Sequence, residues 1–286
     1  MTADPTGNYD AAYHAMLQAG SRRSAAVVLA RAQALVAPAS VVDFGCGSGG
    51  WLAEASALGI TDQAGVDGPW VRAETLQIDP ALFTSADLSA PLDLGRRFDL
   101  ALCLEVAEHL PKAAAPVLID TLCAHAPVVV FSAAIPGQGG EGHVNEAWPP
   151  YWRDLFAARD FEGFDVLRAP IWQDTEVEPW YRQNLLIFAG RAHLVHDTAL
   201  AGRLRDAVAG PLDIVHPAIF QGYCDLVADL SQRSVAERDA QAVRIAELAA
   251  AYEQEAARNA ALRGSVSWRM TAPMRAIARR LRGKGG

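Results

Sequence analysis

The sequence has little of several features that would set its class at once. Its four cysteines, Cys46, Cys103, Cys123 and Cys224, are far apart and form no Cys-x-x-Cys pair, so neither a zinc motif nor a disulfide framework is expected. It contains no apolar run of the roughly 18 residues that a membrane-spanning helix needs. Residues 1–10 are polar and acidic, without the apolar stretch of a signal peptide. These absences favour a cytoplasmic protein.

Positive charge is scarce in most of the chain. The net charge of −8 comes from 25 basic and 33 acidic residues and argues against a general nucleic-acid-binding protein. Residues 258–286, however, hold seven arginines and one lysine and no acidic residue. The rest of the chain therefore has 17 basic against 33 acidic residues. The pattern predicts an acidic body with a basic tail.

Short apolar segments alternate with helical ones between about residues 40 and 190. Strands are expected at 41–44, 63–66, 82–85, 98–104, 128–134, 165–168 and 184–188. This alternation predicts an α/β fold: a Rossmann-like, doubly wound, mostly parallel sheet of seven strands with helices on both faces. In such sheets the ligand lies beyond the carboxyl ends of the strands.

The regions on either side of this fold are expected to be helical. Residues 235–262 contain no glycine or proline, and Ile245, Leu248 and Tyr252 keep a 3-4 spacing that later polar residues interrupt. We therefore expect a long exposed helix or weak coiled coil, which would suit a homodimer. The domains expected are an N-terminal helical cap (1–38), the α/β domain (39–195), a helical extension (196–232) and a long helix with a basic amphipathic tail (233–286).

The most informative segment is residues 41–50, Val-Val-Asp-Phe-Gly-Cys-Gly-Ser-Gly-Gly. A buried strand runs into Asp43 and then into glycines at alternate positions, Gly45, Gly47 and Gly49. Glycine there allows positive φ and lets a ligand lie against bare backbone. The segment also fits the G-x-G-x-x-G fingerprint, with Asp67 about 20 residues further on, so a dinucleotide such as NAD is the alternative ligand.

Acidic residues follow the ends of three further strands. Asp67 ends the second, Asp87 follows the third, and Glu105 follows the fourth. The fourth strand leads into the segment Glu-Val-Ala-Glu-His, in which Glu108 and His109 come three and four residues after Glu105. Carboxylates at strand ends favour a ligand with cationic or hydroxyl groups.

Together these segments resemble the motifs of the class I S-adenosylmethionine-dependent methyltransferases over about residues 40–190. The resemblance implies that S-adenosylmethionine is the cofactor. It implies that Asp67 binds the ribose hydroxyls as a charge-assisted acceptor, that Asp87 binds the adenine amine, and that Leu88 walls the ring. The cofactor-binding residues expected are Asp43, Gly45, Gly47, Gly49, Asp67, Asp87, Leu88 and Glu105.

Two histidines are placed to remove a proton from an oxygen acceptor. His143 lies in a polar, glycine-rich segment after the fifth strand, and we expect it to be the base, oriented by Glu146 or Glu105. His109 is the second candidate, and either residue could instead be an ordinary loop or turn histidine. Imidazoles and carboxylates also suit divalent metals, but no tight ligand spacing supports a site, so no metal is expected.

The end of the chain carries a second resemblance. Residues 262–275 resemble the Ser-x-Ser-Trp-Arg-x-Thr-x-Pro-x-Arg ending of bacterial glycosyltransferases and methyltransferases of surface-polysaccharide pathways. The segment is basic and amphipathic with an interfacial Trp268, which suits the inner face of a membrane or a glycosyltransferase partner. We therefore expect O-methylation of a sugar hydroxyl. The alternatives are methylation of a small carboxylate or phenol, and a non-catalytic scaffold of a glycosyltransferase assembly.

Overall fold

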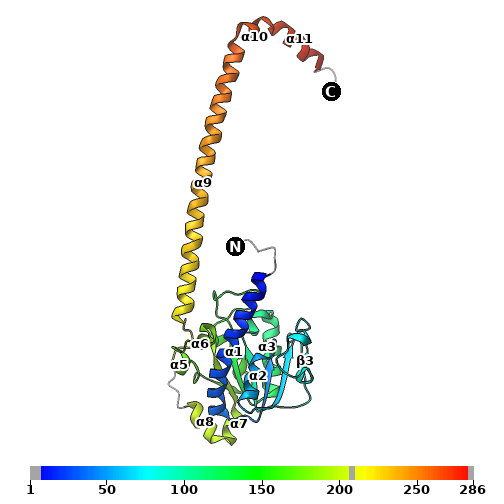
Figure 1. Ribbon diagram of the computed structural model, residues 1–286, viewed down its shortest axis with the longest axis vertical. Coiled ribbons are helices and arrows are strands. Elements are labelled where there is room, and N and C mark those ends of the chain that lie inside the picture. The colour runs from blue at the N-terminus through cyan, green and yellow to red at the C-terminus, as the bar shows by residue number, and fades with distance from the viewer. Residues whose placement is uncertain (1–7, 206–209, 283–286) are drawn as a thin grey trace. The chain divides into compact units, whose positions relative to one another are not determined.

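The computed structural model describes residues 8–205 and 210–282 (Figure 1). The chain divides into two compact units, Met1–Gly222 and Tyr223–Gly286. The first residues of the expected N-terminal cap and Lys284 of the basic tail lie outside the described residues.

A seven-stranded sheet forms the centre of the first unit, in the order β3-β2-β1-β4-β5-β7-β6. The strands β3, β2, β1, β4 and β5 run parallel, and β7 is antiparallel to both β5 and β6. The predicted mostly parallel, doubly wound sheet is confirmed. The strands are β1 (Ser40–Phe44), β2 (Asp62–Asp67), β3 (Phe83–Ser85), β4 (Leu100–Leu104), β5 (Val128–Ser132), β6 (Phe161–Phe164) and β7 (Leu186–Gly190).

Helices cover both faces of the sheet. Successive side chains of a strand point to opposite faces, so Val41 packs with α1 and α2 on one side and Val42 with α3 and α4 on the other. The α-helices of this unit are α1 (Asn8–Val36), α2 (Gly50–Ala57), α3 (Ala115–His125), α4 (Pro149–Ala157), α5 (Arg168–Ile171), α6 (Pro179–Asn184), α7 (Arg191–His196) and α8 (Thr198–Arg205). Short 3-10 turns are η1 (Ala73–Thr75), η2 (Pro80–Leu82), η3 (Ala107–His109) and η4 (Lys112–Ala114).

The prediction of a strand at 165–168 is wrong. The strand β6 ends at Phe164, and α5 begins at Arg168. The Arg168 guanidinium is buried and pairs with Asp165, with Nη2 and Oδ2 2.6 Å apart. This ion pair three residues apart closes a turn that a strand cannot make.

The order of the strands reverses between β1 and β4, because the chain adds β2 and β3 on one side of β1 and β4 and β5 on the other. The loops that follow β1 and β4 therefore diverge and leave a crevice at the carboxyl ends of these two strands. Ligands bind at this position in doubly wound sheets. The glycine loop after β1 and the Glu105 turn after β4 border this crevice.

The second unit is helical. The helix α9 (Pro217–Gly264) begins in the first unit and is longer than expected, and it has no buried residue. It is followed by α10 (Val266–Met270) and α11 (Ala272–Arg282). The Ser265 hydroxyl caps α10 by accepting from the N–H of Trp268 at 3.2 Å, and the Arg275 guanidinium lies 3.8 Å from the centre of the Trp268 ring. Among the described residues, no helix is both long and apolar enough to cross a membrane.

Candidate active site

The glycine loop after β1 requires its glycines for different reasons. Gly45 has φ +86°, and a Cβ there would lie 2.2 Å from Cγ2 of Val106. Gly47 has φ +54°, but its missing Cβ would meet nothing within 4 Å. At Gly49 a Cβ would lie 2.9 Å from Ile78, so this glycine serves packing. Gly47 therefore leaves open space where a bulky ligand can lie against the backbone.

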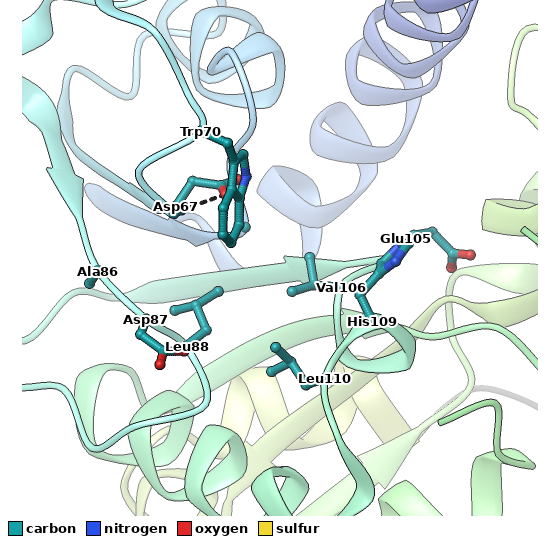
Figure 2. A pocket seen from close by; sticks show the side chains of 11 residues that line it. Asp67, Trp70, Ala86, Asp87, Leu88, Glu105, Val106, His109 and Leu110 are labelled. Carbon is teal, nitrogen blue, oxygen red and sulfur yellow. Dashed lines mark hydrogen bonds between the residues drawn. The ribbon is translucent and has the colours of Figure 1, made fainter. Parts of the chain in front are cut away.

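A cavity of about 390 Å³ opens at the carboxyl ends of the strands, between the loops that follow β1, β2 and β3 and the turn that follows β4 (Figure 2). It brings together five of the expected cofactor residues, Gly45, Asp67, Asp87, Leu88 and Glu105, and also His109. The other lining residues are Gly68, Trp70, Ala86, Val106 and Leu110.

Asp67 ends β2 and joins the cavity to the glycine loop. Its Oδ2 accepts from the N–H of Gly47 at 2.7 Å, and its Oδ1 accepts from the N–H of Gly68 at 2.6 Å. Each carboxylate oxygen has a second lone pair for a ligand hydroxyl. The Trp70 ring lies over Gly68, and a Cβ on Gly68 would be 2.1 Å from this ring. Trp70 is 75% exposed. It offers an aromatic face beside the carboxylate.

Asp87 and Leu88 lie on the loop after β3. The Asp87 Oδ1 accepts from the N–H and the hydroxyl of Ser89 at 2.8 and 2.6 Å, and these bonds hold the pKa of Asp87 below its usual value. Asp87 is therefore an exposed anionic acceptor at the cavity edge, while Leu88 is buried and forms an apolar wall. The pair suits a flat heterocycle with an exocyclic amine.

A second cavity of about 210 Å³ adjoins the first, because Gly45 lines both. Asp43 and Gly47 line it, while Gly49 lines neither cavity. Burial, with the negative charge of Asp67 adding to it, raises the pKa of Asp43 to about 8. Asp43 therefore holds a proton at neutral pH until a cationic group enters this cavity.

Residues of α1, α2 and α6 and of the loop before η2 complete the second cavity, and the sequence did not indicate most of them. Ser21 accepts from Nε1 of Trp51 at 2.9 Å and lies 3.3 Å from the hydroxyl of Tyr181. All three line the cavity together with Gln18 and Gln77. They come from distant parts of the chain, so no local pattern could have brought them together.

Two carboxyl groups meet after β4. Glu105 has φ +54°, and the 3-10 turn η3 follows it. The chain reverses between these residues, and their carboxyls are close enough to share a hydrogen bond. Burial raises the pKa of both, and the charge of Glu105 helps to raise that of Glu108 to about 9. The pair therefore retains a proton at neutral pH.

The loop that carries His143 is fastened to this turn. The backbone N–H groups of Val144 and Asn145 donate to the carbonyl of Glu108 at 2.8 and 3.0 Å. His143 is thereby brought against His109, with ring centroids 4.8 Å apart. Burial and the neighbouring His143 lower the pKa of His109.

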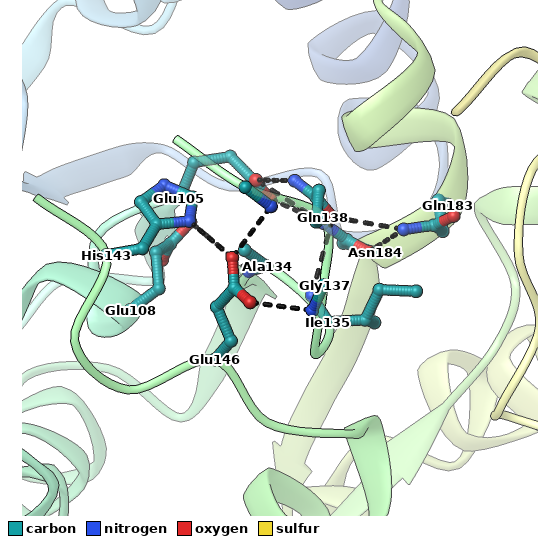
Figure 3. Close-up of polar contacts among 11 residues, drawn as sticks. Glu105, Glu108, Ala134, Ile135, Gly137, Gln138, His143, Glu146, Gln183 and Asn184 are labelled. Atoms are coloured by element: carbon teal, nitrogen blue, oxygen red, sulfur yellow. Dashed lines mark hydrogen bonds and ion pairs between the residues drawn. The ribbon is translucent and has the colours of Figure 1, made fainter. Parts of the chain in front are cut away.

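Glu146 organises the same loop (Figure 3). Its Oε1 lies 2.9 Å from Nδ1 of His143 and accepts from the N–H of Gly139 at 2.9 Å, and its Oε2 accepts from the N–H of Gly137 at 2.7 Å. Burial alone would raise the pKa of Glu146, but these hydrogen bonds lower it. Glu146 is an anion that orients His143 through Nδ1, while Nε2 of His143 lies against Gly140. We call Glu105, Glu108, His109, His143 and Glu146 the histidine–carboxylate cluster.

Buried amides hold Glu105 in place. Asn184 and Gln138 donate to its carboxylate at 3.1 and 3.2 Å, and Gln183 donates to Oε1 of Gln138 at 3.0 Å. Gln138 could not be predicted, because it lies in the glycine-rich loop without a distinguishing sequence pattern.

Comparison with known proteins identifies the family. Residues 16–166, more than half of the chain, match the family model described as a methyltransferase domain. The chain belongs to this methyltransferase family. The methyltransferase is of the class I type that the motifs indicated, with S-adenosylmethionine as its methyl donor. No curated protein matches the chain.

Several solved structures are similar to this chain. DesVI of Streptomyces venezuelae has a TM-score of 0.45 at 15% identity and covers 66% of this chain and 100% of its own. CalS10, an amino pentose methyltransferase from Micromonospora echinaspora, has a TM-score of 0.46 at 19% identity, over 66% and 99%. KedS8, a sugar N-methyltransferase from Streptoalloteichus, has a TM-score of 0.46 at 20% identity, over 67% and 96%.

Proposed function

We propose that this methyltransferase transfers the methyl group of S-adenosylmethionine to a hydroxyl group of a sugar or a sugar-containing acceptor. The observation that supports the proposal is the histidine–carboxylate cluster at the edge of the first cavity. Two members of this cluster, Glu105 and His109, line the cavity. A hydroxyl acceptor must lose its proton during transfer, and the cluster supplies groups that can take it.

The two cavities fit the parts of the cofactor. We place its ammonium group by Asp43, its ribose hydroxyls on Asp67, and its adenine between Asp87 and Leu88. The open space above Gly47 can hold the part of the cofactor that links its ammonium group to its ribose. When bound, S-adenosylmethionine supplies a methyl group already activated by the sulfonium, so the protein contributes mainly position and proton removal.

The acceptor lies between the first cavity and the histidine–carboxylate cluster. Its oxygen forms a bond to the methyl carbon as the carbon–sulfur bond breaks and sulfur keeps the electron pair. The hydroxyl proton passes to the cluster, where we place His143, oriented by Glu146, next to the reacting oxygen. Glu105 and Glu108 add negative charge that would repel a carboxylate acceptor, which favours a neutral hydroxyl.

The sugar is inferred from the basic tail and from an exposed aromatic residue of the loop that carries His143. Trp152 is buried in the core, whereas Trp148, at the end of the glycine-rich loop, is 39% exposed and can stack on a sugar ring. The resemblance of residues 262–275 to endings from surface-polysaccharide pathways points to the same class of acceptor.

The test measures S-adenosylhomocysteine formation by the full chain with four sets of acceptors: sugars, phenols, small carboxylates and amino sugars. We expect turnover with neutral sugar hydroxyls and none with carboxylates. Turnover confined to amines or carboxylates would refute the proposed acceptor and leave the methyltransferase assignment in place. Calorimetric binding of S-adenosylmethionine, with NAD as a control, checks the cofactor first.

We also propose that the basic tail rests on an anionic membrane face. In α10 and α11, Trp268, Met270, Met274 and Ile277 are exposed, and Arg269, Arg275 and Arg279 accompany them. Such a segment lies in the interface with its apolar side chains among the lipid chains and its cations at the headgroups. Sedimentation with vesicles of anionic lipid should remove the full chain from solution, whereas neutral vesicles, or deletion of residues 265–286, should not. Equal binding to both vesicle types would refute the proposal.

A further inference from the structure

We propose that Glu108, His109 and His143 bind a divalent cation. The inference deepens the proposed function, because it rests on the same acceptor site and names the group that would hold the acceptor oxygens there. It departs from the sequence-based expectation of a site without metal.

The spacing of the three side chains fits one ion. One ligand atom from each lies within 4.8 Å of the other two. Ligands about 2.0–2.2 Å from a metal lie roughly 3–4.4 Å apart, so small side-chain adjustments would close the set. Two of the ligands are successive residues at the end of η3, and the backbone bonds from Val144 and Asn145 to Glu108 fix the third beside them.

A buried atom at this place lacks the partner that a cation would provide. Glu108 is 0% exposed, and its Oε1 accepts from the N–H of Ala134 at 3.2 Å. Its Oε2 is buried with no hydrogen bond from a donor group. Within the protein only the proton shared with Glu105 can satisfy this buried oxygen, and a cation next to Glu108 would take the place of that proton.

The imidazoles are oriented as metal ligands are. A metal-binding histidine directs its other ring nitrogen to a carboxylate or a backbone carbonyl, which fixes the tautomer. Nδ1 of His143 has the carboxylate of Glu146 at 2.9 Å. The backbone of Gly142 hydrogen-bonds the imidazole of His109, and the position of a Gly142 Cβ would be 3.5 Å from its Nδ1. Nε2 of His109 is free of this contact. Nε2 of His143 lies against Gly140, where a Cβ would be 2.3 Å from it, so the His143 ring must shift to bind an ion.

The ligand set indicates which ions to expect. Two imidazoles and one carboxylate suit Mn²⁺, Fe²⁺, Co²⁺ or Zn²⁺ better than Ca²⁺, which prefers oxygen ligands alone. Three protein ligands also leave positions open, and His109 borders the cavity that we assign to the cofactor. Two neighbouring hydroxyls of a sugar can fill those positions.

This arrangement changes the role of His143 from base to ligand. A cation held by Glu108, His109 and His143 would displace the proton that Glu105 and Glu108 share and would favour loss of the proton from the acceptor hydroxyl. Glu105, which lies beside Glu108 without belonging to the ligand set, would then be free to receive that proton. The oxygen then attacks the methyl carbon and the sulfur leaves with the electron pair of the broken bond. Glu146 keeps its position on His143.

The test uses Co²⁺ as a probe with the full chain, stripped of metal by a chelator, in the absence of acceptor. We expect one Co²⁺ per chain, with visible absorption bands of mixed nitrogen and oxygen ligands. His143→Ala and Glu108→Gln should each weaken Co²⁺ binding at least about tenfold, whereas His196→Ala, an exposed histidine of α7, should not change it. Thermal unfolding and S-adenosylmethionine binding of the variants show whether each is folded.

The outcomes separate this inference from the proposed function. If the stripped chain binds no Co²⁺, or if both site variants are folded and bind it as the wild type does, the cation site is refuted. Sugar methylation at full rate by the stripped chain would also refute it, while leaving the proposed function intact. Co²⁺ binding that both variants abolish, without turnover on any sugar, would support the site and refute the proposed acceptor.

Discussion

The Asp67 carboxylate accepts a hydrogen bond from the backbone N–H of Gly47 at 2.7 Å, so the end of β2 holds the glycine loop that follows β1. The same side chain accepts from its neighbour Gly68 and lines the first cavity. One residue thus sets the shape of the loop and presents a carboxylate to the ligand.

Asp67→Asn should weaken the binding of S-adenosylmethionine about 10- to 100-fold, because it removes charge-assisted hydrogen bonds worth about 1.5–3 kcal/mol. Isothermal calorimetry measures the dissociation constant. Asp62→Asn is the matched control, since Asp62 lies at the other end of β2 and pairs with Arg96 on the surface. Equal affinities of Asp67→Asn and wild type would show that this carboxylate does not bind the ribose.

Cofactor affinity should increase with pH up to about 8, the pKa of Asp43 in the free protein. Below this pH the buried carboxyl is protonated, and a cationic ammonium group must displace the proton before it can pair with the anion. Calorimetry between pH 6 and 8.5 in buffers of different ionisation enthalpy should detect proton release. In Asp43→Asn the affinity should be weaker and its pH dependence much flatter; an unchanged slope would exclude Asp43 as its source.

The same group should make the free protein less stable as pH rises. The pKa of Asp43 is 3.8 when exposed and about 8 when folded, so between these values the native state keeps a proton that the unfolded chain has lost. Stability therefore falls with increasing pH across this window. Asp43→Asn should raise the Tm of the cofactor-free protein at pH 8, by about 2–4 °C for each kcal/mol of penalty removed, and much less near pH 4. A Tm difference independent of pH would contradict this.

His143→Ala should lower kcat about 10²- to 10⁴-fold and leave the affinity for S-adenosylmethionine within about twofold, because His143 lies on the acceptor side of the site. Glu146→Gln should produce a smaller loss, since the amide can still accept from the loop N–H groups but no longer supports a charged imidazole. Steady-state kinetics with calorimetry separates the two effects. Normal turnover of His143→Ala would remove this residue from proton transfer and from metal binding alike.

Two glycine substitutions should affect different properties, one mainly the stability of the fold and the other mainly cofactor binding. Gly45→Ala brings a methyl group against Val106 and forces positive φ on alanine, so it should destabilise the fold by about 1–3 kcal/mol. Gly47→Ala meets no protein atom and should cost only the backbone strain of about 1–2 kcal/mol, yet reduce cofactor binding strongly. Thermal unfolding and calorimetry distinguish them. Combining Gly45→Ala with Val106→Ala should recover part of the lost stability.

The sequence predicted the sheet because its strands are short apolar runs that end in glycine or acidic residues. It placed Asp43, Asp67, Asp87 and Glu105 at strand ends, and four of these ends meet in space because parallel strands share one edge. It failed at 165–168, where two apolar residues lie between Asp165 and Arg168, because the buried ion pair of these two charged residues outweighs local strand preference.

The approach of Glu108 to Glu105 was not predicted, although both glutamates were visible in one motif. It depends on the positive φ of Glu105 and on a 3-10 turn, neither of which has a reliable signal in a single sequence. The contacts of Gln138, Asn184 and Ser21 could not be predicted for another reason. They join residues that are far apart in the sequence and that only the folded structure brings together.

The amides that hold Glu105 have a wider consequence. Asn184 donates to Glu105, Gln183 donates to Asn184 at 3.0 Å, and the N–H of His216 donates to Gln183 at 2.8 Å. Residue 217 is where α9 begins. The residue that precedes α9 is therefore joined through three hydrogen bonds to a carboxylate that lines the first cavity. By reciprocity, a shift of Glu105 would alter the bonds that hold the start of this helix, and a shift of the helix start would alter those of Glu105.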